Sequence, residues 1–199
     1  VVGGAMGLGK ATGGGAAVGW EGGRGVGGQG AIGLQVLGRL PDMAAVVVPI
    51  GGGGLISGIA IALKERRPDI RIFGVEAAVA ASAMASRQAG KPVKIETSET
   101  IADGIAVKRV GDRTFPIIER YVDAIVSVSE EEIAGAIHLL LEKEKLLAEG
   151  AGAVSLAAIL AGRLPLRPSD VTVMLLSGGN IDVNLLERIV NRGLVTDGR

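Results

Sequence analysis

The sequence predicts an α/β fold in which a mostly parallel sheet carries helices on both faces. Two observations predict it. From residue 44 onward, short apolar runs rich in β-branched residues alternate with segments of helical periodicity. The runs are apolar throughout, which is typical of strands buried on both faces of a parallel sheet. Ligands of such sheets bind beyond the carboxyl ends of the strands, so a functional site is expected there.

Composition limits the classes of function. The chain has 199 residues, with 21 basic and 21 acidic side chains, and this zero net charge argues against a nucleic-acid partner. Cysteine is absent, which excludes disulfides and thiolate metal sites. No apolar run reaches the length of a membrane span, and no signal segment is evident. We therefore expect a soluble, cytoplasmic protein with no membrane partner.

Residues 1–25 form a glycine-rich segment with no steady period, and we expect it to be loose. Residues 4–11 nearly match the spacing of a P-loop. However, Ala11 stands where a hydroxyl would reach Mg²⁺, and the glycines that follow are a poor start for a helix. A nucleoside triphosphate site is therefore only a distant alternative.

Residues 25–30 match the spacing GxGxxG, but no strand precedes them, so a dinucleotide site is weakly supported. The residues that follow, 31–37, have the pattern of a helix that leads to Pro41. We interpret the glycines as the loop that enters this helix.

The central feature is a buried strand at 46–50, four consecutive glycines, and a helix that includes residues 59–64. The glycines are Gly51, Gly52, Gly53 and Gly54, hereafter the tetraglycine turn. Glycines let backbone N–H groups approach a bound oxygen, and a helix N-terminus adds unpaired donors and a positive dipole end. A tight turn without a ligand is the alternative. A turn without a ligand rarely needs four glycines in succession, because each glycine loses conformational entropy on folding. The run of four therefore favours phosphate binding.

The later elements alternate in the same way. They are a strand at 70–76, a small-residue helix at about 79–89, an irregular section with residues 100–106, a helix at about 115–121 and a strand at 124–128. Ser129 and Glu132 have the spacing of a capping box and open the next helix. Its predicted inward residues are Ile133, Ile137, Leu140 and Leu141, and residues 142–145 form a solvated face.

A second predicted strand, at residues 171–176, also ends in a segment that could contribute to a site. Glu149 precedes an Ala-rich helix, residues 171–176 form a final buried strand, and residues 177–180 lead to a last helix. Because carboxyl ends of parallel strands share one edge, Ser177 and the tetraglycine turn are predicted to form one site.

With these residues in view, the chain resembles the serine/threonine dehydratase (threonine ammonia-lyase) family, pyridoxal-phosphate enzymes of the tryptophan-synthase-β fold type. The resemblance runs from about residue 28 to 199. It implies that residues 26–199 are the cofactor-binding large-domain portion of a catalytic domain. The matching segments, in order, are Gly28-Gln29-Gly30, Val48-Pro49-Ile50-Gly51-Gly52-Gly53-Gly54-Leu55, Gly74-Val75-Glu76, Thr100-Ile101-Ala102-Asp103-Gly104, Glu149-Gly150-Ala151-Gly152-Ala153 and Leu176-Ser177-Gly178-Gly179-Asn180.

The resemblance implies a role for each site residue. The tetraglycine turn and the Leu55 amide would hold the phosphate of pyridoxal 5'-phosphate. Ser177 would hydrogen-bond the pyridine nitrogen, the alternative being a cap of the last helix. Gly104 would approach the cofactor with its backbone. Glu149 would lie beside the ring, the alternative being a partner of its own helix dipole.

Other parts of the family pattern are not found. The Schiff-base lysine lies in a Ser-Phe-Lys segment, but neither Phe73 nor Phe115 precedes a lysine, and Lys10 is not assigned to this role. The substrate-carboxylate loop is also missing. His138 is assigned a surface or boundary position in its helix. Some relatives bind a cation through a glutamate at the place of Glu76 and a nearby aspartate; Ser82 replaces the aspartate, so no metal is expected.

The resemblance implies a lyase that converts L-threonine to 2-oxobutanoate and ammonia, here as a truncated catalytic domain. It further implies a small amino-acid substrate (threonine or serine), a homo-oligomer and a role in amino-acid metabolism such as isoleucine biosynthesis. Two alternatives stay open. One is a non-catalytic remnant that binds a phosphate ligand or a full-length partner, and the other is a serine racemase-like enzyme. Residues 1–25 are hypothesised to be a frameshift or truncation product, because GC-rich coding DNA read out of frame gives such a composition.

Overall fold

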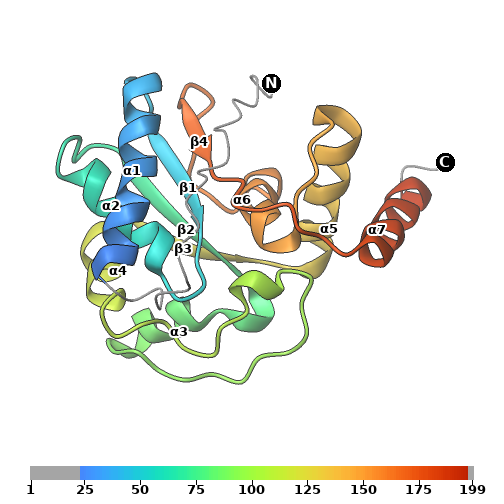
Figure 1. Ribbon diagram of the computed structural model, residues 1–199, viewed down its shortest axis with the longest axis horizontal. Helices are drawn as coiled ribbons and strands as arrows, with labels where there is room; N and C mark the ends of the chain where they lie inside the picture. The colour runs from blue at the N-terminus through green and yellow to red at the C-terminus, as the bar shows by residue number, and fades with distance from the viewer. Residues whose placement is uncertain (1–22, 197–199) are drawn as a thin grey trace.

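A computed structural model describes residues 23–196 of the chain, with side chains described for residues 25–191. Its centre is a four-stranded parallel sheet with the strand order β3-β2-β1-β4 (Figure 1). The strands are β1 (Ala45–Pro49), β2 (Arg71–Ala77), β3 (Ala124–Val128) and β4 (Thr172–Met174). The predicted α/β class with a parallel sheet is thereby confirmed.

Helices cover both faces of this sheet. The α-helices are α1 (Gly23–Arg39), α2 (Gly54–Lys64), α3 (Ser82–Ala89), α4 (Phe115–Tyr121), α5 (Glu130–Leu139), α6 (Gly150–Leu160) and α7 (Val183–Thr196). Short 3₁₀ turns lie at η1 (Ala78–Ala80) and η2 (Asp103–Ile105), and a π-helical turn, η3 (Leu140–Glu144), continues α5. In Figure 1, α1, α2 and α4 lie on one side of the sheet, and α5, α6 and α7 lie on the other.

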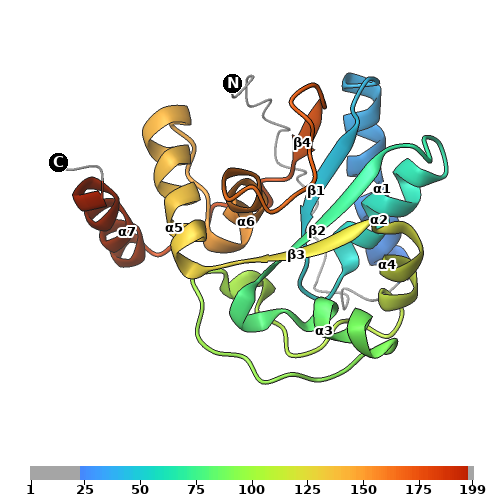
Figure 2. The same cartoon turned by 180° about the vertical axis from the view of Figure 1, so that it is seen from behind.

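The core is divided by the sheet into two apolar layers. Alternate residues of β1 point to opposite faces, so Val46 and Val48 pack in the layer with Ile59 of α2. Val47 packs in the other layer with Val154 of α6. Figure 2 shows from behind the helices on the two sides of the sheet. Burial on both faces explains why the strand segments are continuously apolar.

The strand order creates a topological switch point between β1 and β4. The chain steps from β1 to β2 to β3 in one direction, and then returns to place β4 on the other side of β1. Val47 is paired with Met174 across this boundary, and the Leu175 N–H donates to the Val47 carbonyl (2.9 Å). Connections leave β1 and enter β4 on opposite faces, so a crevice opens at their carboxyl ends.

One prediction about the N-terminal part is wrong. The glycines at 25–30 do not form a loop; they lie within α1. A Cβ on Gly30 would lie 3.3 Å from the Gly58 carbonyl oxygen, and one on Gly58 would overlap the Val26 carbonyl. The absent side chains therefore let α1 and α2 pack with their backbones in contact, which outweighs the poor helix propensity of glycine. The P-loop-like residues 4–11, Lys10 included, lie outside the described residues.

Most other elements agree with the sequence-based prediction. The helix at 115–121 and the strand at 124–128 have the predicted bounds. The capping box is present, since Ser129 Oγ accepts from the Glu132 N–H and Glu132 Oε2 accepts from the Ser129 N–H. The last strand is shorter than predicted, and the helix at 79–89 is divided into η1 and α3. Within residues 23–196, no helix has the length and apolar character needed to cross a bilayer.

Candidate functional site

A pocket of about 240 Å³ lies at the switch point between β1 and β4. All eight residues predicted from the sequence contribute to its lining: Gly51, Gly52, Gly53, Gly54, Leu55, Gly104, Glu149 and Ser177. Three further residues complete it: Pro49, Ile105 and Ala151. Sequence reasoning missed these three, although each lies within two positions of a predicted residue. The roles that the resemblance implies for the eight remain predictions.

The tetraglycine turn joins β1 to α2 at the floor of this pocket. It begins after Ile50, whose N–H donates to the Val75 carbonyl (2.8 Å) and so extends the sheet by one bond. Gly53 has φ +89°, in the left-handed region that only glycine adopts readily. The Ser57 N–H closes the first helical turn by donating to the Gly53 carbonyl (3.0 Å). The amides of the three residues before Ser57 therefore have no acceptor within the helix.

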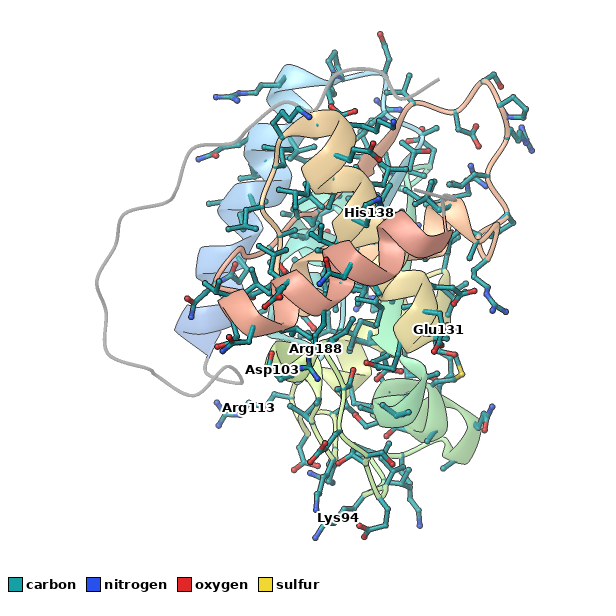
Figure 3. All side chains as sticks on the ribbon, turned by 90° about the vertical axis from the view of Figure 1, so that its right-hand side faces the viewer. Lys94, Asp103, Arg113, Glu131, His138 and Arg188 are labelled. Atoms are coloured by element: carbon teal, nitrogen blue, oxygen red, sulfur yellow. The ribbon has the colours of Figure 1, made fainter. Side chains whose placement is uncertain are left out.

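A second wall comes from the η2 turn. A Cβ on Gly51 would lie 3.1 Å from Ile105 Cα, so this turn rests directly against the glycines. Gly104 is exposed, and its N–H donates to Asp103 Oδ1 (2.7 Å). Figure 3 labels Asp103 on this segment. A Cβ on Gly104 would lie 3.1 Å from Ala151 Cβ, so glycine keeps this part of the pocket open.

Glu149 and Ser177 form the third wall. The Glu149 N–H donates to the Gly178 carbonyl (3.1 Å), and the Glu149 carboxylate accepts from the Asn180 N–H (3.0 Å to Oε2). A Cβ on Gly152 would lie 2.5 Å from the Gly178 carbonyl oxygen. The glycines of this segment therefore permit close approach of the loop after β4 to the start of α6.

The structure rules out a cap of the last helix as the role of Ser177, while the alternative for Glu149, a partner of its own helix dipole, stays a prediction. Ser177 does not cap the last helix, because α7 begins only at Val183 and Asp182 Oδ1 accepts from the Asn184 and Leu185 amides (2.9 and 3.1 Å). Glu149 occupies the position before α6, but its side chain makes no capping bond to that helix. Its carboxylate instead holds the loop that contains Ser177.

The lining residues fit a phosphorylated ligand. The start of α2 presents unpaired amides and the positive end of the helix dipole, and its first turn carries no acidic residue. Leu55 is half-buried and lines the pocket. On the other side of the switch point, Ser177 offers an exposed hydroxyl that both donates and accepts. This set suits a phosphate at one end and a ring nitrogen at the other.

Among the described residues, neither a lysine nor a histidine lines the pocket. His138 lies on α5, labelled in Figure 3, with its Nε2 3.5 Å from Glu142 Oε2. Its side chain is 13% exposed, which is the boundary position predicted for it.

Glu76 lies at the carboxyl end of β2 and is fully buried. Its carboxylate accepts from the Ala83 N–H (2.8 Å) and the Met84 N–H (2.9 Å), so it binds the N-terminus of α3. Burial raises the pKa of this carboxyl to about 7, although the backbone hydrogen bonds act in the opposite direction. Within residues 23–196, no three acidic or histidine side chains are grouped as metal ligands.

A second pocket, of about 340 Å³, lies at the amino ends of the strands, and its lining includes Arg67, Arg71 and Arg167. Two of these arginines are already bonded to carboxylates. Arg67 donates to Asp69 (2.7 and 2.9 Å), and Arg71 donates to Asp170 (2.5 Å). The carboxylates offset the arginine charge, which makes this pocket a poorer anion site than the tetraglycine turn.

Fold and site together define a parallel α/β protein with a glycine turn and a pocket at a strand switch point. Residues 11–178 match the family described as pyridoxal-phosphate dependent enzyme. This match covers more than half of the chain, so the chain belongs to the pyridoxal-phosphate dependent enzyme family.

Relatives give a finer comparison. The chain is 59% identical over 172 residues to L-threonine ammonia-lyase of Geobacter sulfurreducens. This match covers 86% of the present chain and 42% of the relative. It is 50% identical over 174 residues to L-threonine ammonia-lyase of Thermotoga maritima, and this match covers 87% of the present chain and 43% of the relative. The chain therefore spans less than half the length of these two relatives.

Solved structures of pyridoxal-phosphate enzymes have a similar fold. The fold is similar to the threonine deaminase of T.th., with a TM-score of 0.76 at 39% identity over 81% of this chain and 56% of that one. It is also similar to maize serine racemase, with a TM-score of 0.76 at 33% identity over 88% and 54%. The predicted family and fold type are confirmed, and pyridoxal phosphate is the cofactor of this family.

Proposed function

We propose that the chain is the cofactor-binding part of a threonine ammonia-lyase, which converts L-threonine to 2-oxobutanoate and ammonia. One observation carries the proposal: the tetraglycine turn, Gly104, Glu149 and Ser177 converge on one pocket. Support also comes from the relatives, which are named for this activity at 50% and 59% identity.

In this proposal the chain's residues bind and orient the cofactor. The amides at the start of α2 hold the phosphate, and the helix dipole favours its negative charge. The Ser177 hydroxyl bonds the ring nitrogen. Because a hydroxyl is neutral, it does not hold that nitrogen protonated as a carboxylate would. The bound cofactor supplies an electron sink for loss of the Cα proton and departure of the β-hydroxyl.

The reaction also needs a base that removes the Cα proton, and no lysine among residues 23–196 lines the pocket. The base must then come from outside the described residues or from another polypeptide. The same observation favours a second candidate, a non-catalytic chain that binds the phosphate ligand or a full-length partner.

One experiment separates these candidates. The purified chain is incubated with pyridoxal phosphate, desalted, reduced with borohydride and mapped for any lysine bonded to the cofactor. In parallel, 2-oxobutanoate from L-threonine and D-serine from L-serine are measured. Retained cofactor with 2-oxobutanoate supports the lyase, and D-serine alone supports the racemase alternative that the maize structure suggests. Retained cofactor without either product supports the binding chain. No retained cofactor overturns the lyase and the phosphate-binding form of the second candidate.

We also propose a cytoplasmic homo-oligomer that acts in amino-acid metabolism, on a route to isoleucine. Apolar side chains left open to solvent support association: Leu147 and Leu160 are 50% exposed, and Val183 is 77% exposed. Sedimentation velocity across a tenfold range of concentration tests this. A single monomeric species at every concentration contradicts it.

A further inference from the structure

We propose that Thr114, which does not line the pocket, is the positioning residue of the tetraglycine turn. Its hydroxyl holds the Gly52 carbonyl, and this aims the amides of the turn into the pocket. The inference concerns how the phosphate site is built, so its functional meaning rests on the function proposed above.

The geometry begins with a buried hydroxyl. Thr114 is fully buried, and its Oγ1 lies 2.6 Å from the Gly52 carbonyl oxygen and 3.2 Å from that of Gly111. A hydroxyl has one proton to donate, and the shorter distance assigns it to Gly52. The Gly111 N–H donates to the same Gly52 carbonyl (3.2 Å). Two donors from the segment before α4 therefore fix one peptide plane of the turn.

That plane also sets the direction of an amide. In a planar trans peptide the C=O of Gly52 and the N–H of Gly53 point in opposite directions. The carbonyl is held toward Thr114, so the Gly53 N–H points away from Thr114. Gly52 and Gly53 both line the pocket whereas Thr114 does not, and from this we infer that the pocket lies on the side to which the Gly53 N–H points. Loss of the Thr114 bond would release the plane to rotate and would turn a donor away from the ligand.

Thr114 is unusual in how it uses its hydroxyl. It occupies the position before α4, where threonine commonly caps the helix, but it makes no side-chain capping bond there. Its hydroxyl is directed instead to a turn 62 residues earlier in the chain. A Cβ on Gly53 would lie 2.8 Å from Thr114 Oγ1 and 2.8 Å from Ile118 Cδ1, so the two segments are closely matched in shape.

The test separates the effect of the Thr114 hydroxyl from the effects of side-chain shape and of general stability. Thr114→Val removes the hydroxyl and keeps the shape, while Thr114→Ser keeps the hydroxyl. Ser155→Ala is the matched control, because Ser155 is also fully buried and also donates to a backbone carbonyl, that of Val47 (3.3 Å), away from the turn. Equilibrium dialysis measures affinity for pyridoxal phosphate, and hydrogen exchange measures the Gly53, Gly54 and Leu55 amides of the free protein.

Thr114→Val should weaken pyridoxal phosphate binding by about tenfold or more, as loss of one buried hydrogen bond implies. Thr114→Ser should stay within about threefold of the wild type. Ser155→Ala should lower the melting temperature comparably and leave the affinity unchanged. Equal affinities for Thr114→Val and Ser155→Ala overturn the inference. If Thr114→Val does not fold, Thr114→Cys takes its place. A thiol is a weak hydrogen-bond donor, so the same loss of affinity is expected for this variant.

The exchange data keep this inference separate from the proposed function. If the wild type binds no pyridoxal phosphate, the proposed function fails and the exchange rates alone decide about Thr114. Exchange of the turn amides that is about tenfold faster in Thr114→Val than in Ser155→Ala supports positioning. Equal rates in the two variants overturn it.

Discussion

The backbone N–H of Asn180 donates to the Glu149 carboxylate at 3.0 Å, and this bond ties the loop after β4 to the start of α6. A second bond, from the Glu149 N–H to the Gly178 carbonyl, runs the other way. Ser177 lies directly before this tied segment. Its place in the pocket therefore depends on Glu149, a residue that the resemblance assigned to the cofactor ring.

Removing the Glu149 carboxylate should weaken cofactor binding by freeing this loop. Glu149→Ala leaves the Asn180 amide without its charged acceptor, and affinity for pyridoxal phosphate should fall by roughly tenfold. Fluorescence titration measures the affinity. Glu187→Ala, at an exposed position on α7, is the control and should bind as the wild type does. Unchanged binding by Glu149→Ala would show that the loop holds its position without the carboxylate.

A methyl group at Gly178 should damage the same contact from the other side. A Cβ there would overlap the Glu149 carboxylate and displace it from the Asn180 amide, so Gly178→Ala should lower the free energy of unfolding by about 1 kcal/mol, the cost of that hydrogen bond. Gly135→Ala on α5 is the matched control. A Cβ at Gly135 meets nothing within 4 Å, and alanine should stabilise this helix by about 1 kcal/mol. Urea denaturation measures both, and equal effects would contradict the packing argument.

Gly53→Ala should remove phosphate binding and destabilise the fold. Alanine is strained at φ +89°, and its Cβ would press on Thr114 and Ile118. Gly90→Ala isolates the strain, because Gly90 has φ +67° with open space around it. Both variants should lose about 1 kcal/mol of stability or more, but only Gly53→Ala should lose pyridoxal phosphate binding. Intact binding in Gly53→Ala would place the phosphate elsewhere.

Glu76 should make stability depend on pH. Its pKa is about 7 in the folded state against 4.5 without the fold, so folding is favoured by this group below pH 4.5. That stabilisation is lost as pH rises through 7, and the loss amounts to roughly 3 kcal/mol.

The measurement is urea unfolding at pH 5 and pH 8.5 for the wild type and Glu76→Gln, which does not ionise. The wild type should lose more stability than the variant between these pH values. Parallel pH profiles for the two proteins would mean that Glu76 keeps its ordinary pKa.

Sequence patterns predicted that the tetraglycine turn and Ser177 lie close together, because both follow a topological rule. The carboxyl ends of adjacent parallel strands share an edge, so a turn after β1 and a serine after β4 had to come close together. The capping box at Ser129 and Glu132 was equally readable, because its two bonds lie within four consecutive residues.

Features that depend on distant partners could not be read in this way. The glycines of α1 are helical because Gly30 packs against the Gly58 carbonyl, a contact invisible to local propensity. Thr114 carries no sequence signal, since its acceptor on Gly52 lies 62 residues away. Asp182, not Ser177, caps the last helix because the loop after β4 is longer than the pattern suggested.

In the function proposed above, the tetraglycine turn binds the phosphate of the cofactor. Its most direct test is titration of ¹⁵N-glycine-labelled protein with pyridoxal phosphate, followed by amide shifts. We expect saturable shifts of Gly51, Gly52, Gly53 and Gly54, and smaller ones at Gly104. Unmoved signals for these glycines at saturating cofactor would contradict it.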